Sequence, residues 1–177
     1  MPVILLLGGV RSGKSRLAAQ LAARTSAPVT VIATAEGRDE EMTSRIARHR
    51  EERPQEWTTI EEPLDLAAAL GKVPTDAVVV LDCVTMWVSN VMERGVDDDA
   101  VLERAQRAAG LAAGRTGLVI VVSNEVGSGV IPTTPLGRRF SELLGSVNAM
   151  WAEAAERSAL VVAGKVLTLR DAAELLP

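Results

Sequence analysis

A glycine-rich segment near the start of the chain has the residue types and spacing of a phosphate-binding loop. It follows a short apolar run, leads into a helix-like pattern, and consists of Gly8, Gly9, Val10, Arg11, Ser12, Gly13, Lys14 and Ser15. The glycines let backbone amides turn onto a polyphosphate, and the following helix N-terminus adds its positive dipole end. In this pattern the lysine neutralises phosphate oxygens and the hydroxyl binds Mg²⁺. We therefore expect a nucleotide here, with Lys14 catalytic and Ser15 a metal ligand, rather than a turn with a solvated lysine.

A carboxylate is expected close to this loop. Asp82 ends the apolar run Val78 to Leu81 and so lies at the carboxyl end of an expected strand. In phosphate-loop enzymes a second carboxylate on the Mg²⁺ side occupies such a position. Asp82 is therefore a candidate catalytic, nucleotide-binding and metal-linked residue. The alternative is a helix N-cap for the segment that follows.

His49 is the only histidine, so any imidazole chemistry must use it. On an expected helix, Arg45 and Arg53 lie four residues to either side of it, and Glu52 lies three residues ahead. Flanking guanidinium groups disfavour a second positive charge, which would keep the imidazole neutral, nucleophilic and able to attack phosphorus. Glu52 could orient the ring through its other nitrogen.

Two other interpretations of this helix remain open. Met42, Ile46 and His49 fall on one face, so the histidine could simply end an apolar stripe. The helix could instead be a lid whose arginines clamp a transferred phosphate, as in small-molecule kinases, with Arg45, Arg48, Arg50 and Arg53 as the clamp.

Three further polar positions have simpler explanations or weaker signals. The loop from Ser123 to Gly129 supplies Glu125 as a possible proton acceptor after a strand. The run Asp97-Asp98-Asp99 resembles a metal cluster, but at a helix start an N-cap with dipole-favourable neighbours is the better interpretation. Cys83, the only cysteine, is expected to be a small buried apolar residue.

The composition narrows the class of protein. The chain has 177 residues, is 47% apolar, and has a formal net charge of −4 with acids and bases interspersed. This length fits one domain, residues 1–177, with a core that needs no disulfide. The charge pattern argues against nucleic acid as a partner. No apolar run approaches the length of a membrane span or a signal peptide, so we expect a cytoplasmic protein without a membrane partner.

The apolar pattern predicts a doubly wound α/β fold, a mainly parallel sheet of the P-loop NTPase type flanked by helices. Continuous Val, Ile and Leu runs predict strands at Val3–Leu7, Val29–Ala33, Ala77–Cys83 and Leu118–Ser123. Helical patterns lie between or after them, at Lys14–Arg24, Asp39–Arg53, Leu64–Leu70, Thr85–Arg94 and Asp98–Ala113.

The last third of the chain predicts a long helix and then a hairpin. After Pro135, apolar residues recur at steps of three and four, at Leu136, Phe140, Leu143, Leu144, Val147 and Trp151, which predicts one long amphipathic helix. We expect Phe140 and Trp151 in the core rather than in a base-stacking platform. Two apolar runs flank Gly164-Lys165, which predicts a C-terminal antiparallel edge hairpin with Gly at the first turn position. Arg170 to Leu176 could form a short helix.

These motifs together resemble the bifunctional adenosylcobinamide kinase/adenosylcobinamide-phosphate guanylyltransferase family of cobalamin biosynthesis. The matching strings run nearly the full length of the chain: the phosphate loop, Ile32-Ala33-Thr34-Ala35, Glu41-Met42 with Arg45-Ile46 and His49, Arg53-Pro54 with Trp57, Asp82-Cys83 with Trp87 and Ser89-Asn90, and Ser123-Asn124-Glu125-Val126-Gly127. Val10 stands where many members have Ala.

The resemblance implies two reactions and a set of site residues. Members phosphorylate adenosylcobinamide with a nucleoside triphosphate, GTP or ATP, and then attach GMP from GTP through a covalent GMP-histidine, which here would be His49. Beyond the phosphate loop, the implied nucleotide contacts are Thr34, Ala35, Glu36, Arg50, Glu51, Glu52, Arg53, Glu62 and Asp82. Glu61 could equally occupy the place of Glu62. The resemblance also implies a homotrimer.

Attack at the γ- and α-phosphorus demands different nucleotide placements, so we expect the segment 36–56 to move between the steps. Two alternatives remain: a monofunctional small-molecule kinase with an arginine-rich lid, and a regulatory GTP-binding module. The second is disfavoured, because no Asn-Lys-x-Asp or Asp-x-x-Gly string follows the loop.

Overall fold

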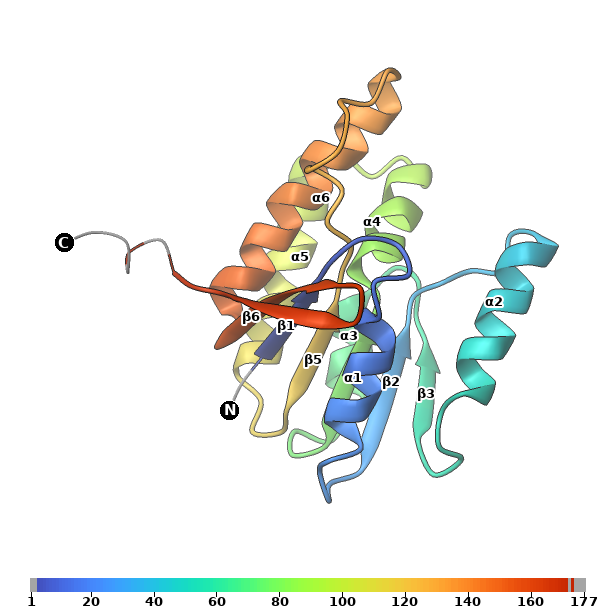
Figure 1. Cartoon of the computed structure of the whole chain (residues 1–177), viewed down its shortest axis with the longest axis vertical. Coiled ribbons are helices and arrows are strands. Elements are labelled where there is room, and N and C mark those ends of the chain that lie inside the picture. The colour runs from blue at the N-terminus through green and yellow to red at the C-terminus, as the bar shows by residue number, and fades with distance from the viewer. Residues whose placement is uncertain (1–2, 172, 174–177) are drawn as a thin grey trace.

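The computed structural model describes residues 3–171 and Ala173, except for the side chain of Arg45. Most of the short helix expected at Arg170 to Leu176 lies outside these residues. One seven-stranded sheet runs through the molecule in the order β3-β2-β4-β5-β1-β6-β7 (Figure 1). The strands are β1 (Val3–Leu7), β2 (Val29–Ala33), β3 (Thr58–Glu61), β4 (Val78–Asp82), β5 (Val119–Val122), β6 (Arg157–Val162) and β7 (Lys165–Leu169).

Every strand pair is parallel except β6 with β7, which is antiparallel. The predicted mainly parallel sheet with an antiparallel C-terminal edge is therefore confirmed. Helices cover both faces of this sheet, and they are α1 (Lys14–Ala22), α2 (Glu40–Glu51), α3 (Leu66–Gly71), α4 (Val84–Glu93), α5 (Asp98–Ala113) and α6 (Pro135–Ala154).

Two apolar cores lie on opposite faces of the sheet. Alternate residues of β5 take part in different cores, Val119 and Val121 in one and Ile120 and Val122 in the other. The first core is closed by α3, α4, α5 and α6, and the second by α1 (Figure 1). This double coverage explains why the central strands are continuously apolar.

The strand β3 was not predicted. Three of its four residues, from Thr58 to Glu61, are polar, and its side chains are exposed or only partly buried. The strand lies at the sheet edge, where it pairs only with β2. An edge strand needs no continuous apolar run, because one side of it faces solvent. The pattern of apolar residues therefore could not predict this strand.

The long helix α6 follows the expected apolar stripe with one exception. Trp151 is fully buried and Phe140 packs against the first core, so both are core residues as predicted. Leu136 belongs to the same apolar stripe, but its side chain is 65% exposed. It lies in the first turn of α6, which extends past the ends of the neighbouring helices (Figure 1).

The hairpin turn differs by one residue from the prediction. Val162 pairs with Lys165, so the two turn residues are Ala163 and Gly164, with φ of 51° and 74°. Positive φ at both central positions is typical of a type I′ turn, which favours glycine at the second. Gly164 is therefore the second turn residue and not the first. Its N–H donates to the carbonyl of Ser12, 2.8 Å away, so the turn contacts the phosphate loop.

The helix α2 differs from the other helices in how little of it packs against the rest of the protein. It begins after Asp39, whose side chain accepts a hydrogen bond from the backbone N–H of Met42. None of its described side chains is buried, and the helix stands away from the two cores at the β3 edge (Figure 1). Its position therefore depends on the segments that connect it and on a few polar contacts.

Candidate active site

The phosphate loop connects β1 to α1 in a conformation that requires glycine. Gly8 and Gly13 have φ of 150° and 103°, values that residues with a side chain rarely adopt. A Cβ on Gly8 would lie 2.3 Å from the carbonyl oxygen of Val161. The hairpin strand β6 therefore supports the loop from behind, and only a residue without a side chain fits between them.

Gly8→Ala should destabilise the fold, because the added methyl group meets backbone that cannot rotate away. We expect the free energy of unfolding to fall by about 2 kcal/mol or more. The matched control is Gly9→Ala, since a Cβ there meets no atom within 4 Å and should cost less than about 0.5 kcal/mol. Urea denaturation measures both, and equal midpoints for the two variants would contradict this account of the loop.

Lys14 closes the loop on itself. Its ammonium donates to the carbonyls of Gly8 and Gly9, at 2.8 and 2.7 Å, and the side chain is buried. The lysine is thus fixed at the N-terminus of α1, where the helix dipole and the loop amides add to its positive potential. This arrangement favours the binding of an anion.

Asp82 lies at the carboxyl end of β4, directly beside the loop. Its Oδ1 accepts a hydrogen bond from the hydroxyl of Ser15 at 3.2 Å. The alternative of a helix N-cap is wrong, because the residue at the N-cap of α4 is Cys83. A hydroxyl and a carboxylate oxygen side by side suit Mg²⁺, which binds oxygen ligands and is commonly held by one or two protein groups, substrate phosphates and water. The residues present therefore fit this ion.

His49 reaches the same carboxylate from the opposite side. Its Nδ1 lies 3.9 Å from Oδ2 of Asp82, and its side chain is 32% exposed. The carboxylate beside the imidazole is therefore that of Asp82. The expectation that Glu52 orients the ring is wrong, because Glu52 is exposed near the end of α2. One aspartate thus connects the phosphate loop to the only histidine.

The basic residues after His49 lie in two environments. Arg53 is partly buried, and its burial lowers the pKa of the guanidinium, an effect that the nearby Asp82 carboxylate opposes. Arg50 is exposed and forms an ion pair with Glu61 at 3.5 Å. Together with Glu51, both arginines line a cavity of about 430 Å³. Arg48 is exposed, and the side chain of Arg45 lies outside the described part of the structure.

The resemblance implies nucleotide contacts in the segments that follow β2 and β3. The polar side chains there already form hydrogen bonds within the protein. The buried Thr34 hydroxyl donates to the carbonyl of Cys83 at 2.6 Å and accepts from its N–H at 2.9 Å. Ala35 follows it with a partly buried side chain. Glu62 accepts from the N–H groups of Leu64 and Asp65 at the start of α3.

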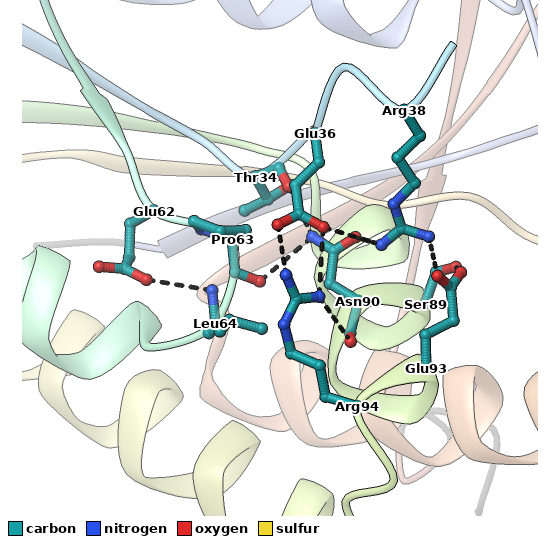
Figure 2. A network of polar contacts seen from close by, with 10 residues as sticks. All are labelled: Thr34, Glu36, Arg38, Glu62, Pro63, Leu64, Ser89, Asn90, Glu93 and Arg94. Atoms are coloured by element: carbon teal, nitrogen blue, oxygen red, sulfur yellow. Dashed lines mark hydrogen bonds and ion pairs between the residues drawn. The ribbon is translucent and has the colours of Figure 1, made fainter.

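The Glu36 carboxylate is held by two arginines of this chain. Arg94 and, to a lesser extent, Arg38 lower its pKa through hydrogen bonds. Figure 2 shows this contact as part of a network around Asn90, a fully buried residue of α4. Residue-type reasoning did not find this network, although Ser89-Asn90 belongs to one of the matching strings. The only signal was the presence of polar residues in an otherwise apolar helix.

The loop after β5 lies against the phosphate loop. The N–H of Glu125 donates to the carbonyl of Gly8 at 3.1 Å, and the Glu125 carboxylate accepts from the N–H of Gly127 at 2.6 Å.

The other polar positions singled out in the sequence have structural roles. Asp97 caps α5 by accepting a hydrogen bond from the N–H of Ala100, so the N-cap interpretation is confirmed there. Among residues 3–171 and 173, no cluster of three or more histidine, cysteine or acidic side chains is arranged to hold a metal. Cys83, expected to be a buried apolar residue, is only partly buried and packs against the second core. Burial raises the pKa of its thiol to about 11.

A family model described as cobinamide kinase/cobinamide phosphate guanyltransferase matches residues 4–169. The chain belongs to this family. It is similar to the bifunctional adenosylcobalamin biosynthesis protein CobP of Pseudomonas aeruginosa, with 43% identity over 94% of this chain and 96% of the relative. It is also 37% identical to CobU of Escherichia coli, over 92% and 96%. The chain is accordingly an enzyme of cobalamin biosynthesis with kinase and guanylyltransferase activities.

Solved structures support the fold. The RadB recombinase matches 90% of this chain and 73% of its own length, with a TM-score of 0.51 and 20% identity. An ATPase of the type III secretion system matches 90% and 51%, with a TM-score of 0.54 and 12% identity. Both likenesses indicate the P-loop NTPase fold alone. No helix within the described residues is both long and apolar enough to span a membrane.

Proposed function

We propose that this chain phosphorylates adenosylcobinamide and then transfers GMP to the product through a covalent bond to His49. One observation carries the proposal. Asp82 contacts the hydroxyl of Ser15 in the phosphate loop with one oxygen and lies 3.9 Å from Nδ1 of His49 with the other. A nucleotide bound on the loop would therefore have the only imidazole of the chain close to its phosphates.

In the kinase step, the phosphate loop holds the triphosphate of GTP or ATP. Lys14 and the loop amides stabilise negative charge on the transferring γ-phosphoryl group. Mg²⁺, held by Ser15 and Asp82, would neutralise phosphate oxygens as a Lewis acid. The substrate hydroxyl attacks the γ-phosphorus, the bond to the β-phosphate oxygen breaks, and a nucleoside diphosphate leaves. We propose Glu125 as the acceptor of the hydroxyl proton.

In the second step, His49 is the nucleophile. Asp82 lies beside Nδ1, so it favours the tautomer with the proton on Nδ1 and leaves the lone pair on Nε2. A separation of 3.9 Å is too long for a hydrogen bond, but such contacts often tighten only when substrate binds. Nε2 attacks the α-phosphorus of GTP and pyrophosphate leaves. A phosphate oxygen of the phosphorylated corrinoid then displaces the histidine, which is restored.

The remaining site assignments support this sequence of steps. The segment 36–56 moves between the attacks at γ- and α-phosphorus, and α2 suits such movement because none of its described side chains is buried. Arg50, Glu51 and Arg53, which line the neighbouring cavity, contact the nucleotide, and so do Glu52 and Glu62 outside that lining. We propose further that residues 1–177 act as one cytoplasmic domain that assembles as a homotrimer.

Incubation with α-labelled GTP tests the proposal directly. This mechanism requires radioactive protein after denaturation, with a phosphoramidate linkage that acid cleaves and alkali spares. A monofunctional kinase with an arginine-rich lid would leave the protein unlabelled. γ-Labelled GTP is the matched control, because its label departs with pyrophosphate and the histidine adduct would carry none.

A further inference from the structure

The segment between β2 and α2 is tied to α4 by five polar side chains, called the α4 clamp here (Figure 2). Its members are Glu36 and Arg38 from the segment, Asn90 and Glu93 from α4, and Arg94 at the C-cap of α4. Glu36 accepts from Arg94 at two points, with Oε1 2.6 Å from Nη2 and Oε2 3.2 Å from Nη1. Arg38 donates to Glu36, to the side-chain oxygen of Asn90 and to Glu93. Two hydrogen bonds between the same pair of side chains fix the orientation of the Glu36 carboxylate relative to Arg94 as well as their separation.

Asn90 connects the clamp to the body of the protein. Its side chain is fully buried, and its amide donates to the carbonyls of Thr34 at 2.7 Å and Pro63 at 3.2 Å. These carbonyls belong to the segments that follow β2 and β3. The amide thus uses both hydrogens on backbone and its oxygen on Arg38, so the clamp rests on a fixed point.

Few other contacts hold α2 in place. At its carboxyl end, the Arg50–Glu61 pair and the Arg53–Thr59 hydrogen bond measure 3.5 and 3.4 Å. His49 lies about 15 Å along the helix from its N-cap at Asp39, at about 1.5 Å per residue. A tilt of about 4° at the clamp would therefore displace the imidazole by about 1 Å. The His49–Asp82 contact, at 3.9 Å, is longer still, so the shorter hydrogen bonds of the clamp are expected to constrain that angle most.

We propose that Arg94 and Asn90 are positioning residues for guanylyl transfer, because through Glu36 and Arg38 they hold α2, during the attack at the α-phosphorus, in the orientation that places His49 at the nucleotide. The inference rests on the proposed function of His49. Neither residue touches the reacting atoms. The kinase step uses Lys14 and Ser15, whose described contacts are with the phosphate loop and Asp82 and not with Arg94. Loss of Arg94 alone should therefore affect one reaction and not the other.

Arg94→Ala tests this division, with Arg104→Ala as a matched control on the exposed face of α5. In a single turnover with α-labelled GTP, we expect Arg94→Ala to form the protein adduct at least about tenfold more slowly, since a misplacement of about 1 Å costs up to about 100-fold. Phosphorylation of the corrinoid should stay within about twofold of wild type, and Arg94→Lys should recover part of the loss. The control should match wild type in both reactions.

A double-mutant cycle shows whether Arg94 acts through Glu36. Glu36→Gln with Arg94→Ala should form the adduct no more slowly than the slower single variant. Trypsin should also cut within residues 38–53 of Arg94→Ala faster than in wild type, at an unchanged urea midpoint.

Each outcome decides between the proposals. If wild type forms no adduct, the function proposed for His49 fails. If wild type forms the adduct and Arg94→Ala forms it equally fast, the positioning role alone is overturned. A parallel loss of both activities with a lower urea midpoint would also overturn it, since that pattern indicates a general structural role.

Discussion

His49→Asn should abolish guanylyl transfer and leave the kinase intact. Asparagine has a similar size and polarity but no lone pair that can attack phosphorus, so formation of the adduct should fall by at least about 10³-fold. Phosphorylation of adenosylcobinamide depends on the phosphate loop, and its rate should stay within about threefold of wild type. Separate assays with α- and γ-labelled nucleotide measure the two activities.

The control for this variant is Glu40→Gln, an exposed position in the first turn of the same helix. It should preserve both reactions. An equal loss of kinase and guanylyltransferase activity in His49→Asn would defeat the division of labour, because it would mean that the imidazole serves a step or a structure common to both.

Asp82→Asn should impair both activities. The carboxylate accepts a hydrogen bond from the hydroxyl of Ser15 and lies beside His49, so its negative charge would act both on a Mg²⁺ ion held there and on the imidazole. Loss of that charge should lower each rate by about 100-fold or more, the scale seen when a group that stabilises developing charge is removed. Steady-state assays of each reaction, at several Mg²⁺ concentrations, measure the effect.

The effect of Asp82→Asn is best interpreted beside that of His49→Asn. Two single variants, one affecting a single reaction and one affecting both, would identify Asp82 as the group shared by the two steps. A kinase that retained full activity in Asp82→Asn would show that the metal is held without this carboxylate.

Much of the framework could be predicted because its signals are local. The phosphate loop has a fixed spacing, the buried strand Val3–Leu7 has a continuous apolar run, and the helix Asp98–Ala113 has a cap and a periodic pattern, so both elements were predicted with their observed bounds. In each case the residues that define the element are neighbours in sequence. Burial on both faces of the sheet made the signal stronger.

The contacts of the site could not be predicted in the same way, because they depend on where α2 lies. Sequence spacing made Glu52 the expected partner of His49, but the fold brings Asp82 to the imidazole from another strand. The clamp contact between Glu36 and Arg94 likewise joins residues far apart in the chain. The edge strand β3 was missed because its solvent exposure is set by the tertiary arrangement, which periodicity does not report.

The central claim is that His49 becomes covalently bonded to GMP. Wild-type protein incubated with GTP and Mg²⁺ can be kept at alkaline pH, digested, and mapped by tandem mass spectrometry. The account predicts one GMP group on the peptide that contains His49, with the fragment ions assigning it to the imidazole. An unmodified His49 peptide under conditions that support guanylyl transfer, or a GMP group on any other residue, would contradict it.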